Sequence, residues 1–567
     1  MSKNLSQQKR ENLLNNIKVM REKLKDNPQL VKSLADIESE LKRKKYGLIW
    51  EEHEEKVDEE LKTKIPVFIE EKKLEIKDQG KNPINFLIEG DNLHSLYLLE
   101  KTHKEAIDII YIDPPYNTKN KEFVYDDTLI GGDDGFRHSK WLSFMNRRLK
   151  KAKELLSKKG IIFISIDDNE YSQLKMLCDE IFDEDNYVAT LHWKKKKQPS
   201  YLHGQVAGVM EYILIYCKDR NSLDKLSITT PTDSNTRVDN ANNQESERVI
   251  KKGIRVKLPK NISIIPAGVY RNKTMETEFL DDVHIKNGRT INDFKAIARF
   301  RDSQERINMF VEKDVLFITK NYGFRRDKLE EELNKKKAIT DLLLDWGDNQ
   351  DSDQELKEIF REKIFSYPKP ILLIKNIIKS TGYENGTILD FFAGSGTTGH
   401  AVLELNKEDG GKRKFILCTN NENKICEEIT YNRIKTVITG KRIDNTKYSE
   451  GISANLKYYK TEYIDRFNHE DEGYYIVNEL SRYIKELVQL ENGIEIENKS
   501  VQVLFTDEEI DEFSKNDDLV KECKILYIDT NALITDQQME KFEDNNIKVL
   551  YIPEYYFEEE IMEVEQW

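Results

Sequence analysis

The sequence predicts an α/β protein built around a mostly parallel sheet, and two short apolar runs carry that prediction. Residues 106–112 are apolar and β-rich and end at Asp113-Pro114-Pro115-Tyr116, and residues 387–391 end at a glycine-rich turn. Apolar runs of this length, stopped by residues that turn sharply, are typical of buried parallel strands. Loops at the carboxyl ends of such strands bind ligands in open α/β sheets. We therefore expect both motifs to line one crevice.

The glycine turn reads Phe-Ala-Gly-Ser-Gly-Thr over residues 392–397 and leads into a helix predicted to begin near Thr397. Gly394 and Gly396 let the backbone approach a ligand closely and leave free N–H groups at the amino end of the helix. With Gly399 they also match the spacing of the dinucleotide-binding fingerprint. Taken alone, the turn fits a nucleotide-like cofactor or an ordinary structural turn.

The Asp-Pro-Pro-Tyr motif supplies the groups needed to alkylate an amine that is a poor nucleophile. The exocyclic nitrogen of adenine has its lone pair delocalised into the ring, and an acceptor on each N–H would weaken that delocalisation. Asp113 can supply one acceptor and the carbonyl of Pro114 the other, because successive prolines fix the backbone and cannot donate. Tyr116 offers a flat face on which an extruded base can stack. The alternative is that the prolines merely end a strand and Tyr116 is packed.

Together the two motifs resemble those of the amino-methyltransferases that use S-adenosylmethionine, and specifically the DNA adenine-N6 class in which the catalytic motif precedes the cofactor motif. The resemblance is closest to the modification (Mod) subunits of type III restriction-modification systems and covers roughly residues 5–440. It implies a permuted, Rossmann-like methyltransferase fold. The further stretches that carry it are residues 88–93, 123–127, 138–141, 163–170, 367–370 and 413–422.

The resemblance also implies a set of site residues. Those that would hold and activate the target amine are Asp113, Pro114, Pro115 and Tyr116. Those that would bind S-adenosyl-L-methionine are Asp91, Lys369, Asp390, Phe392, Ala393, Gly394, Ser395, Gly396, Thr397 and Glu422. The chain departs from the family at the acid that closes the second strand, where it has Thr419-Asn420, so Glu422 stands as the candidate ribose ligand. Asp167 and Asp168 end another apolar strand and fit either the border of the base pocket or a strand-end cap.

Length and composition predict a multidomain protein of the cytoplasm. The 567 residues are long for one core and suggest two to four domains. The five cysteines show neither C-x-x-C pairing nor clustering with histidine, so we expect no disulfide framework and no metal. The start is polar and no apolar stretch approaches about 18 residues, so we expect no membrane association.

The predicted domains follow the motifs. They are a helical region (1–80), the catalytic half of the core (81–190), a target-recognition insertion (191–365), the cofactor-binding half of the core (366–460) and a small acidic α/β domain (461–567). The helical region would pack on the core or a second subunit, or wrap DNA. The acidic domain would be a docking surface for a partner or would simply aid solubility.

Net charge is −14, which at first argues against nucleic acid. The acid is concentrated in residues 465–567, with a net charge of −19, whereas residues 189–337 carry +10. A long basic insertion between the two motifs is a separate functional unit, since the sheet itself needs only short connections there. The lysines of residues 194–197, and Arg299, Arg301, Arg325 and Arg326, are candidate DNA contacts, with solvated charges or ion pairs as the alternative.

The sequence thus predicts a sequence-specific DNA adenine-N6 methyltransferase that acts on a flipped-out base in double-stranded DNA. No ATP-binding loop or nuclease set is found in the chain, so cleavage would belong to a separate helicase/nuclease restriction subunit. The resemblance also implies a homodimer. The alternatives are a solitary methyltransferase, N4-cytosine specificity, methylation of RNA or of a protein glutamine, and a catalytically silent DNA-binding subunit.

Overall fold

The computed structural model of the chain separates into two compact units, residues 1–225 with 340–567 and residues 226–339. The residues that it describes are 5–23, 28–42, 50–78, 82–118, 124–125, 128–129, 134–199, 205–228, 235–259, 261–272, 275–333, 336–466, 472–495 and 499–565. Phe123, Asp126 and Asp127, which contribute to the family resemblance, lie outside them. Among the described helices, none has the length and apolar character needed to cross a membrane.

A ten-stranded sheet forms the centre of the first unit, in the order β1-β25-β2-β24-β23-β3-β6-β8-β7-β22. In that order the strands are Lys64–Glu70, Asn455–Asp465, Ile84–Glu89, Lys414–Thr419, Thr387–Asp390, Ile107–Ile112, Leu156–Ile166, Met210–Cys217, Tyr187–Lys194 and Leu342–Leu343. The six strands from β25 to β6 are parallel to one another, whereas β1 and β8, which flank them, are antiparallel. The predicted α/β class with a mostly parallel sheet is confirmed.

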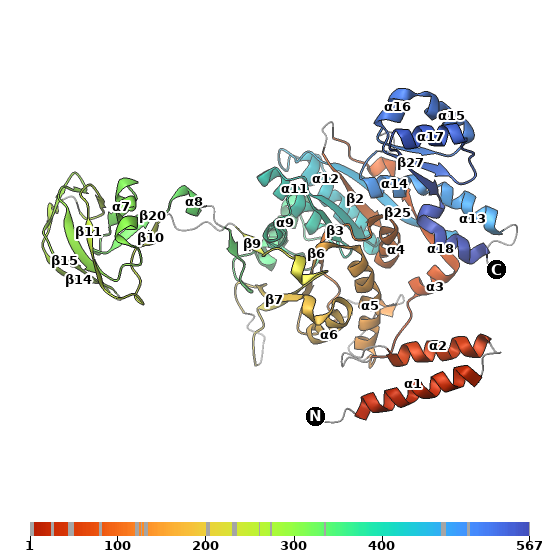
Figure 1. Cartoon of the computed structure of the whole chain (residues 1–567), viewed down its shortest axis with the longest axis horizontal. Coiled ribbons are helices and arrows are strands. Elements are labelled where there is room, and N and C mark those ends of the chain that lie inside the picture. The colour runs from red at the N-terminus through yellow and green to blue at the C-terminus, as the bar shows by residue number, and fades with distance from the viewer. Residues whose placement is uncertain are drawn as a thin grey trace. The chain divides into compact units, whose positions relative to one another are not determined.

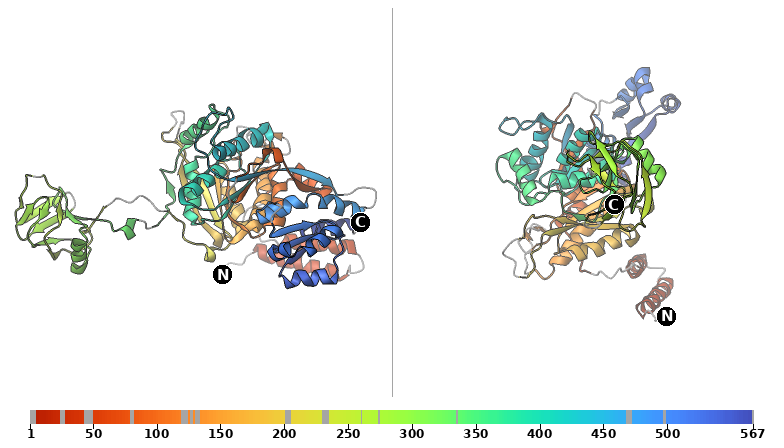
Figure 2. Two further views of the ribbon diagram at one scale, coloured as in Figure 1. Left: turned by 90° about the horizontal axis from the view of Figure 1, so that it is seen from above. Right: turned by 90° about the vertical axis from the view of Figure 1, so that its left-hand side faces the viewer.

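Two layers of helices cover the sheet, one on each face (Figures 1 and 2). The layer of α4, α5 and α6 belongs to the larger apolar core, and α10, α11 and α12 form the other layer. Their bounds are Asn92–His103, Arg137–Leu155, Tyr171–Phe182, Ile371–Thr381, Thr397–Asp409 and Tyr431–Thr439. Because the strands are buried from both sides, they are apolar throughout rather than alternating. The chain enters β3 and β6 before β23 and β24, which is the permuted order that the motifs predict.

The predicted insertion at 191–365 and the second compact unit have different limits. Residues 191–225 hold the end of β7 and all of β8, which pair with each other and, through β8, with β6 in the main sheet. Residues 340–365 also fall in the first unit. The apolar run that follows Glu211, at residues 212–216, predicts a strand that returns the chain to the sheet, and this run forms β8. Its antiparallel pairing with β6 brings its first residues to the carboxyl ends of the parallel strands.

The second unit is a β-rich domain with its own core. Its two larger sheets follow the orders β10-β20-β19-β12-β17-β16-β13 and β11-β18-β15-β14. The strands of the first sheet are Asn235–Arg237, Phe324–Asp327, Leu316–Ile318, Arg255–Val256, Arg289–Thr290, Val283–Lys286 and Ile264–Ile265; those of the second are Ser246–Ile250, Phe294–Ala298, Met275–Phe279 and Gly268–Asn272. Phe279, Phe294, Phe300 and Phe324 meet in the centre. This core is the physical basis for a separately folded unit.

The carboxyl-terminal region contains a β-α-β unit and one further strand. Strands β26 (Val501–Leu504), β27 (Ile525–Asp529) and β28 (Lys548–Ile552) form a parallel sheet with α17 (Asp536–Asp544) between the last two. The acidic stretch at 558–560 lies within α18, Glu554–Glu565, rather than in an extended tail. Glu560 is buried and lies 2.6 Å from Nζ of Lys101 on α4, so part of this acid serves the contact with the core.

Helices also occupy the amino-terminal region, as predicted. α1 and α2, Leu5–Lys23 and Pro28–Lys42, contact each other and share an ion pair between Arg21 and Glu38. α3, Lys56–Thr63, begins at a capping box formed by Glu55. Whether α1 and α2 contact DNA or another subunit remains a prediction.

A buried arginine ties the start of α3 to the core. Arg148 on α5 has no exposed surface, and its two terminal nitrogens donate to the two carboxylate oxygens of Glu55 at 2.8 and 3.1 Å. Its Nε donates to Asn92 at the start of α4 at 2.5 Å. Two segments far apart in the sequence are thereby held to one helix.

Arg148→Ala should destabilise the first unit by about 3 kcal/mol, near the low end for breaking a buried ion pair, because it removes a buried charge that pairs with Glu55 and Asp91 and leaves Glu55 with Arg147 as a remaining basic partner. Denaturant unfolding followed by circular dichroism would measure the loss. Lys62→Ala is the matched control, since Lys62 and Glu54 pair at 3.0 Å with 61% of each side chain exposed, and an exposed pair contributes at most about 1 kcal/mol. Equal effects of the two substitutions would contradict this account.

Candidate functional site

The two sequence motifs lie side by side at one edge of the main sheet. β3 leads into residues 113–116, β23 leads into the glycine turn, and the two strands are parallel neighbours with Ile109 opposite Ile388. Their carboxyl ends therefore meet, as the sequence predicts. The neighbouring strands β2 and β24 are also parallel, and they bring Asp91 and Glu422 to the same edge.

An ion pair occupies the centre of this edge. Nζ of Lys369, which precedes α10, donates to both carboxylate oxygens of Asp113 at 2.7 Å and to the hydroxyl of Tyr116 at 2.9 Å. Only 8% of Lys369 is exposed. Burial lowers the pKa of Lys369, but the carboxylates of Asp113 and Glu211 outweigh it, so that the pKa is raised overall and the lysine is charged. The sequence places Lys369 among the cofactor ligands; the structure brings it to the catalytic motif.

Glu211 is a second carboxylate in this cluster, and sequence reasoning missed it. It lies at the start of β8, with Oε1 2.9 Å from Nζ of Lys195 and Oε2 3.2 Å from the hydroxyl of Tyr116. Oε2 is also 3.7 Å from Nζ of Lys369. The available signal was an acid placed directly before the apolar run of a predicted strand, at the end of the strand that reaches the site.

One backbone carbonyl of the catalytic motif accepts a hydrogen bond from the described part of the protein, and the carbonyl before it does not. The indole N–H of Trp141 on α5 donates to the carbonyl of Pro115 at 2.7 Å. The carbonyl of Pro114 receives no hydrogen bond from any residue that the structure describes. Tyr116 donates its hydroxyl to Oδ1 of Asp113 at 2.9 Å and packs its ring against the main core. The motif thus offers a carboxylate and a free carbonyl close together.

Three side chains fix the chain immediately after Tyr116. Asn117, in the left-handed region with φ of 53°, donates its side-chain amide to Oε1 of Glu170. The same oxygen lies 2.6 Å from Nδ1 of His138. Burial raises the pKa of Glu170 to about 8. His138 and Glu170 fall in stretches that carry the family resemblance, but nothing in the local pattern indicates that they meet Asn117.

The glycine turn needs glycine at two positions, because of the backbone angles there and because a Cβ atom would crowd neighbouring side chains. Gly394 and Gly396 have φ of +48° and +77°, which other residues adopt at a cost. A Cβ on Gly396 would lie 3.1 Å from Cγ2 of Thr430, and one on Gly394 would lie 3.3 Å from the ring of Phe365. Helix α11 then begins at Thr397 without a side-chain cap. In the described residues, no group accepts from the amides of Thr397 and Thr398. The turn therefore presents free N–H donors.

Several predicted cofactor ligands make hydrogen bonds within the protein that hold this turn in place. Asp390 is buried, accepts from the amide of Phe392 at 3.0 Å and from Oγ1 of Thr398 at 2.5 Å, and burial raises its pKa to about 7. Arg433 on α12 is fully buried and donates through Nη1 to Oγ of Ser395 at 3.1 Å and to Oγ1 of Thr397 at 2.8 Å. Sequence reasoning missed Arg433, which has no local signal.

The other predicted cofactor ligands differ in their exposure and in their contacts with the rest of the protein. Asp91 caps α4 through the amide of Leu93 at 2.7 Å and has 35% of its side chain exposed. Glu422 is exposed in the turn after β24. Phe392 is partly buried with its ring centre 5.8 Å from that of Phe144, and Ala393 donates its amide to Cys418 at 3.1 Å.

The remaining candidates are largely engaged in contacts with the protein. Asp167 accepts from the amide of Asn169 at 2.9 Å, which fits the strand-end cap, and Asp168 accepts from the hydroxyl of Tyr212 at 2.7 Å. Arg326 is buried and donates to both carboxylate oxygens of Glu332, at 2.5 and 2.7 Å, so the ion-pair alternative holds for it.

The basic run after β7 is partly neutralised as well. Lys195 pairs with Glu211, and Lys197 pairs with Asp348 at 3.3 Å and Asp351 at 3.1 Å. A role in DNA contact therefore stays a prediction for Lys194, Lys196, Arg299, Arg301 and Arg325. Arg301, for example, is exposed.

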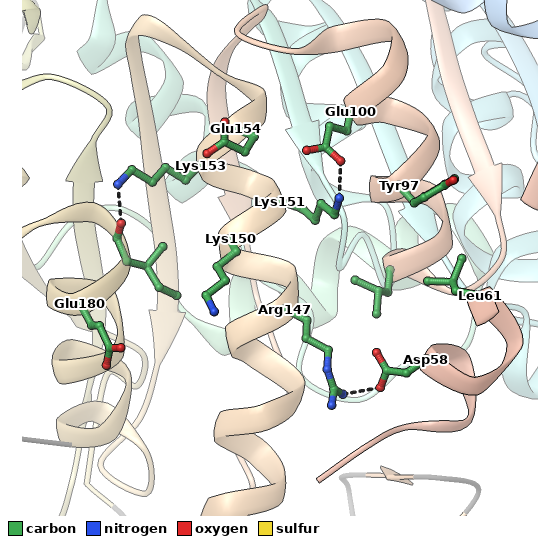
Figure 3. A pocket seen from close by; sticks show the side chains of 12 residues that line it. Asp58, Leu61, Tyr97, Glu100, Arg147, Lys150, Lys151, Lys153, Glu154 and Glu180 are labelled. Atoms are coloured by element: carbon green, nitrogen blue, oxygen red, sulfur yellow. Dashed lines mark hydrogen bonds and ion pairs between the residues drawn. The ribbon is translucent and has the colours of Figure 1, made fainter. Parts of the chain in front are cut away.

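A groove of about 670 Å³ lies elsewhere, along α4, α5 and α6 (Figure 3). Its lining mixes apolar side chains with both signs of charge: Asp58, Leu61, Leu93, Tyr97, Glu100, Arg147, Lys150, Lys151, Lys153, Glu154, Glu180 and Ile181. None of the predicted site residues lines it.

Comparison with known proteins identifies the family to which the chain is similar. Residues 107–432 match a family described as DNA methylase. The chain is 33% identical over 409 residues to the Mod subunit of the type III restriction-modification enzyme StyLTI from Salmonella typhimurium, covering 66% of this chain and 59% of the relative. It is 32% identical over 389 residues to the type II methyltransferase M.KpnI from Klebsiella pneumoniae, covering 66% of this chain and 90% of the relative. The chain thus spans less than two thirds of the StyLTI subunit.

Among solved structures, the PvuII DNA methyltransferase (cytosine-N4-specific) is 13% identical, covers 63% of this chain and 93% of its own, and gives a TM-score of 0.33.

Proposed function

Because the chain belongs to the DNA methylase family, we propose that it transfers a methyl group from S-adenosyl-L-methionine to N6 of adenine in double-stranded DNA. The observation that carries the proposal is the meeting of two motifs at one sheet edge. Asp113 and the free carbonyl of Pro114 lie at the end of β3, and the glycine turn lies at the end of β23 next to it. An amine held by the first would face a methyl donor held by the second.

The residues at the glycine turn fit S-adenosyl-L-methionine. Gly394 and Gly396 hold the turn in left-handed backbone conformations, and the amides of Thr397 and Thr398 have no acceptor among the described residues. Phe392 offers an apolar surface. Asp91 and Glu422 add carboxylates, which suit the amino and hydroxyl groups of such a molecule. When bound, the cofactor supplies a methyl group attached to a positively charged sulfur.

The chain's residues would make the adenine amine nucleophilic. One amine N–H would donate to Asp113 and the other to the carbonyl of Pro114, which directs the nitrogen lone pair away from the ring system and towards the glycine turn. Tyr116 would support the flipped base. Formation of the N–C bond would be balanced by loss of the S–C bond of the cofactor, and the amine would then release one proton, which the carboxylate of Asp113 can accept. Positioning accounts for most of the rate gain in such a transfer.

Mapping modified bases tests this proposal directly. DNA from cells that express the protein, and from cells that do not, would be sequenced by a single-molecule method that detects methylated bases. We expect N6-methyladenine at one short recognition sequence and only in the expressing cells. N4-methylcytosine at that sequence would replace the adenine assignment, and absence of any modified base, with cofactor binding intact, would favour a silent DNA-binding subunit.

We further propose that the protein works as a dimeric modification subunit beside a separate restriction subunit in the cytoplasm. The support is its 30–33% identity to the type III Mod subunits of StyLTI and EcoPI. A methylated sequence that is asymmetric, and so modified on one strand, would agree with this assignment. Light scattering of the purified protein would test the dimer, and a monomeric mass with full activity would remove it from the proposal.

A further inference from the structure

The charge cluster at the sheet edge contains two carboxylates, those of Asp113 and Glu211. Lys369 and Tyr116 make their shorter contacts with Asp113. Lys369 lies 2.7 Å from both oxygens of Asp113, and the hydroxyl of Tyr116 donates to the same carboxylate at 2.9 Å. An ammonium group binds a carboxylate more strongly than a neutral amine does. In the state shown by the structure, the residue proposed to receive the target amine is therefore already occupied.

Lys369 cannot simply move into water. It is only 8% exposed, and a buried ammonium group without a carboxylate partner is costly. Glu211 is a second carboxylate close to it, with Oε2 3.7 Å from Nζ. A shift of about 1 Å would bring the lysine to normal hydrogen-bond distance from Glu211.

Tyr116 can make the same exchange. Its hydroxyl has one proton and two carboxylates within reach, Asp113 at 2.9 Å and Glu211 at 3.2 Å. Rotation of that proton from the first to the second would free Oδ1 of Asp113. The Glu211 side chain is fixed in a position to accept from both donors. Lys195 donates to its Oε1 at 2.9 Å, and the Glu211 side chain is only 10% exposed.

We propose that Glu211 is a positioning residue that receives Lys369 and the Tyr116 hydroxyl when the target amine takes their place on Asp113. The cluster would thus have two states. In one, Lys369 and Tyr116 donate to Asp113; in the other, they donate to Glu211, and Asp113 is free to accept from the substrate. Glu211 acts through Lys369 and Tyr116 and need not touch the base. This inference rests on the proposed methyl transfer and adds to it the means by which substrate gains access to Asp113.

Glu211→Gln tests the exchange with almost no change in shape. If the glutamine oxygen keeps the contact with Lys195, its NH2 group faces Lys369 and Tyr116 and can accept from neither. Asp113 would stay occupied. We expect the single-turnover methylation rate at a DNA site mapped by sequencing to fall about a hundredfold, comparable to misplacing a reacting group by about 1 Å. The dissociation constants for S-adenosyl-L-methionine and DNA should change less than about threefold.

A spectroscopic measurement separates this role from a general loss of structure. DNA carrying 2-aminopurine at the target position should fluoresce on binding to the wild type and remain quenched with Glu211→Gln. Glu70→Gln is the matched control, because Glu70 is also buried and ion-paired, to Lys457, but lies on β1 at one end of the same sheet. It should leave both the rate and the fluorescence unchanged even if it lowers the melting temperature.

The outcomes are distinct. Wild-type rate and fluorescence in Glu211→Gln would overturn the inference and leave the methyltransferase proposal intact. No methylation by the wild type would overturn the proposed function itself. If Glu211→Gln fails to fold, Lys195→Met replaces it: Lys195 has 21% of its side chain exposed, and its loss releases Glu211 from its anchor. That variant should lower the rate by at least about threefold, and an unchanged rate would equally overturn the inference.

Discussion

Asp113→Ala should lower the rate of methyl transfer about a thousandfold, the upper end of the effect expected when an enzyme loses a group that acts on developing charge in the transition state. The substitution removes one of the two acceptors proposed for the target amine, and the carbonyl of Pro114 alone cannot orient both N–H bonds. Cofactor affinity should stay within about threefold of wild type, since the glycine turn is built by Asp390 and Arg433 and not by Asp113. Single-turnover methylation and calorimetric titration would measure the two quantities.

Asp113→Asn provides the control for packing. It preserves volume but offers one acceptor oxygen instead of two, and its NH2 group would face the ammonium of Lys369. We expect it to be nearly as inactive as Asp113→Ala. Lys369 keeps Glu211 as a partner in both variants, so melting temperatures should fall modestly. More than about a tenth of wild-type activity in Asp113→Ala would remove Asp113 from the role assigned to it.

The parts of the site that lie in continuous sequence were predictable. The apolar runs that become β3 and β23 end at their motifs, and the rule that ligands bind at the carboxyl ends of parallel strands places those motifs together. The return strand β8 was predictable for the same reason, from one apolar run. Local pattern and element type were enough for each of these conclusions.

The contacts that complete the site were not predictable, because they join residues far apart in the chain. Lys369 and Asp113 are 256 positions apart, and Arg433 and Thr397 are 36 apart. Each of these side chains, seen alone, is an ordinary charged residue. A single sequence has no signal for such a pairing, since periodicity reports which face a residue is on and not which distant residue it meets.

The limits of the insertion show a related difficulty. The expected boundary at residue 191 follows the change to basic composition, but residues 191–225 complete β7 and supply β8 of the main sheet. Sheet pairing and not charge decides where the first unit ends. The same holds at the acidic end of the chain, where Glu560 is buried against Lys101 instead of extending into solvent.

Arg433→Met should weaken binding of S-adenosyl-L-methionine about a hundredfold, which corresponds to roughly 2.7 kcal/mol. Arg433 is fully buried and donates to the carbonyl and hydroxyl of Ser395, at 3.3 and 3.1 Å, and to the hydroxyl of Thr397. Burial lowers the pKa of Arg433 to about 10, so it is still charged at neutral pH. Hydrogen bonds from a charged donor contribute about 1.5–3 kcal/mol each, and their loss would release a turn that holds two residues in left-handed backbone conformations.

Calorimetric titration with the cofactor would measure this effect, with Lys435→Ala as the control. Lys435 is on the same helix, α12, but is exposed, and its Nζ lies over the ring of Tyr431 at 5.6 Å from the ring centre. Comparison with Asp113→Ala shows whether the two motifs have separate tasks. If the two motifs have separate tasks, Arg433→Met should lose cofactor affinity and Asp113→Ala should lose turnover while keeping affinity. Wild-type affinity in a folded Arg433→Met would show that the turn is rigid without its arginine, and that Asp390 and the two glycines are enough to shape the cofactor site.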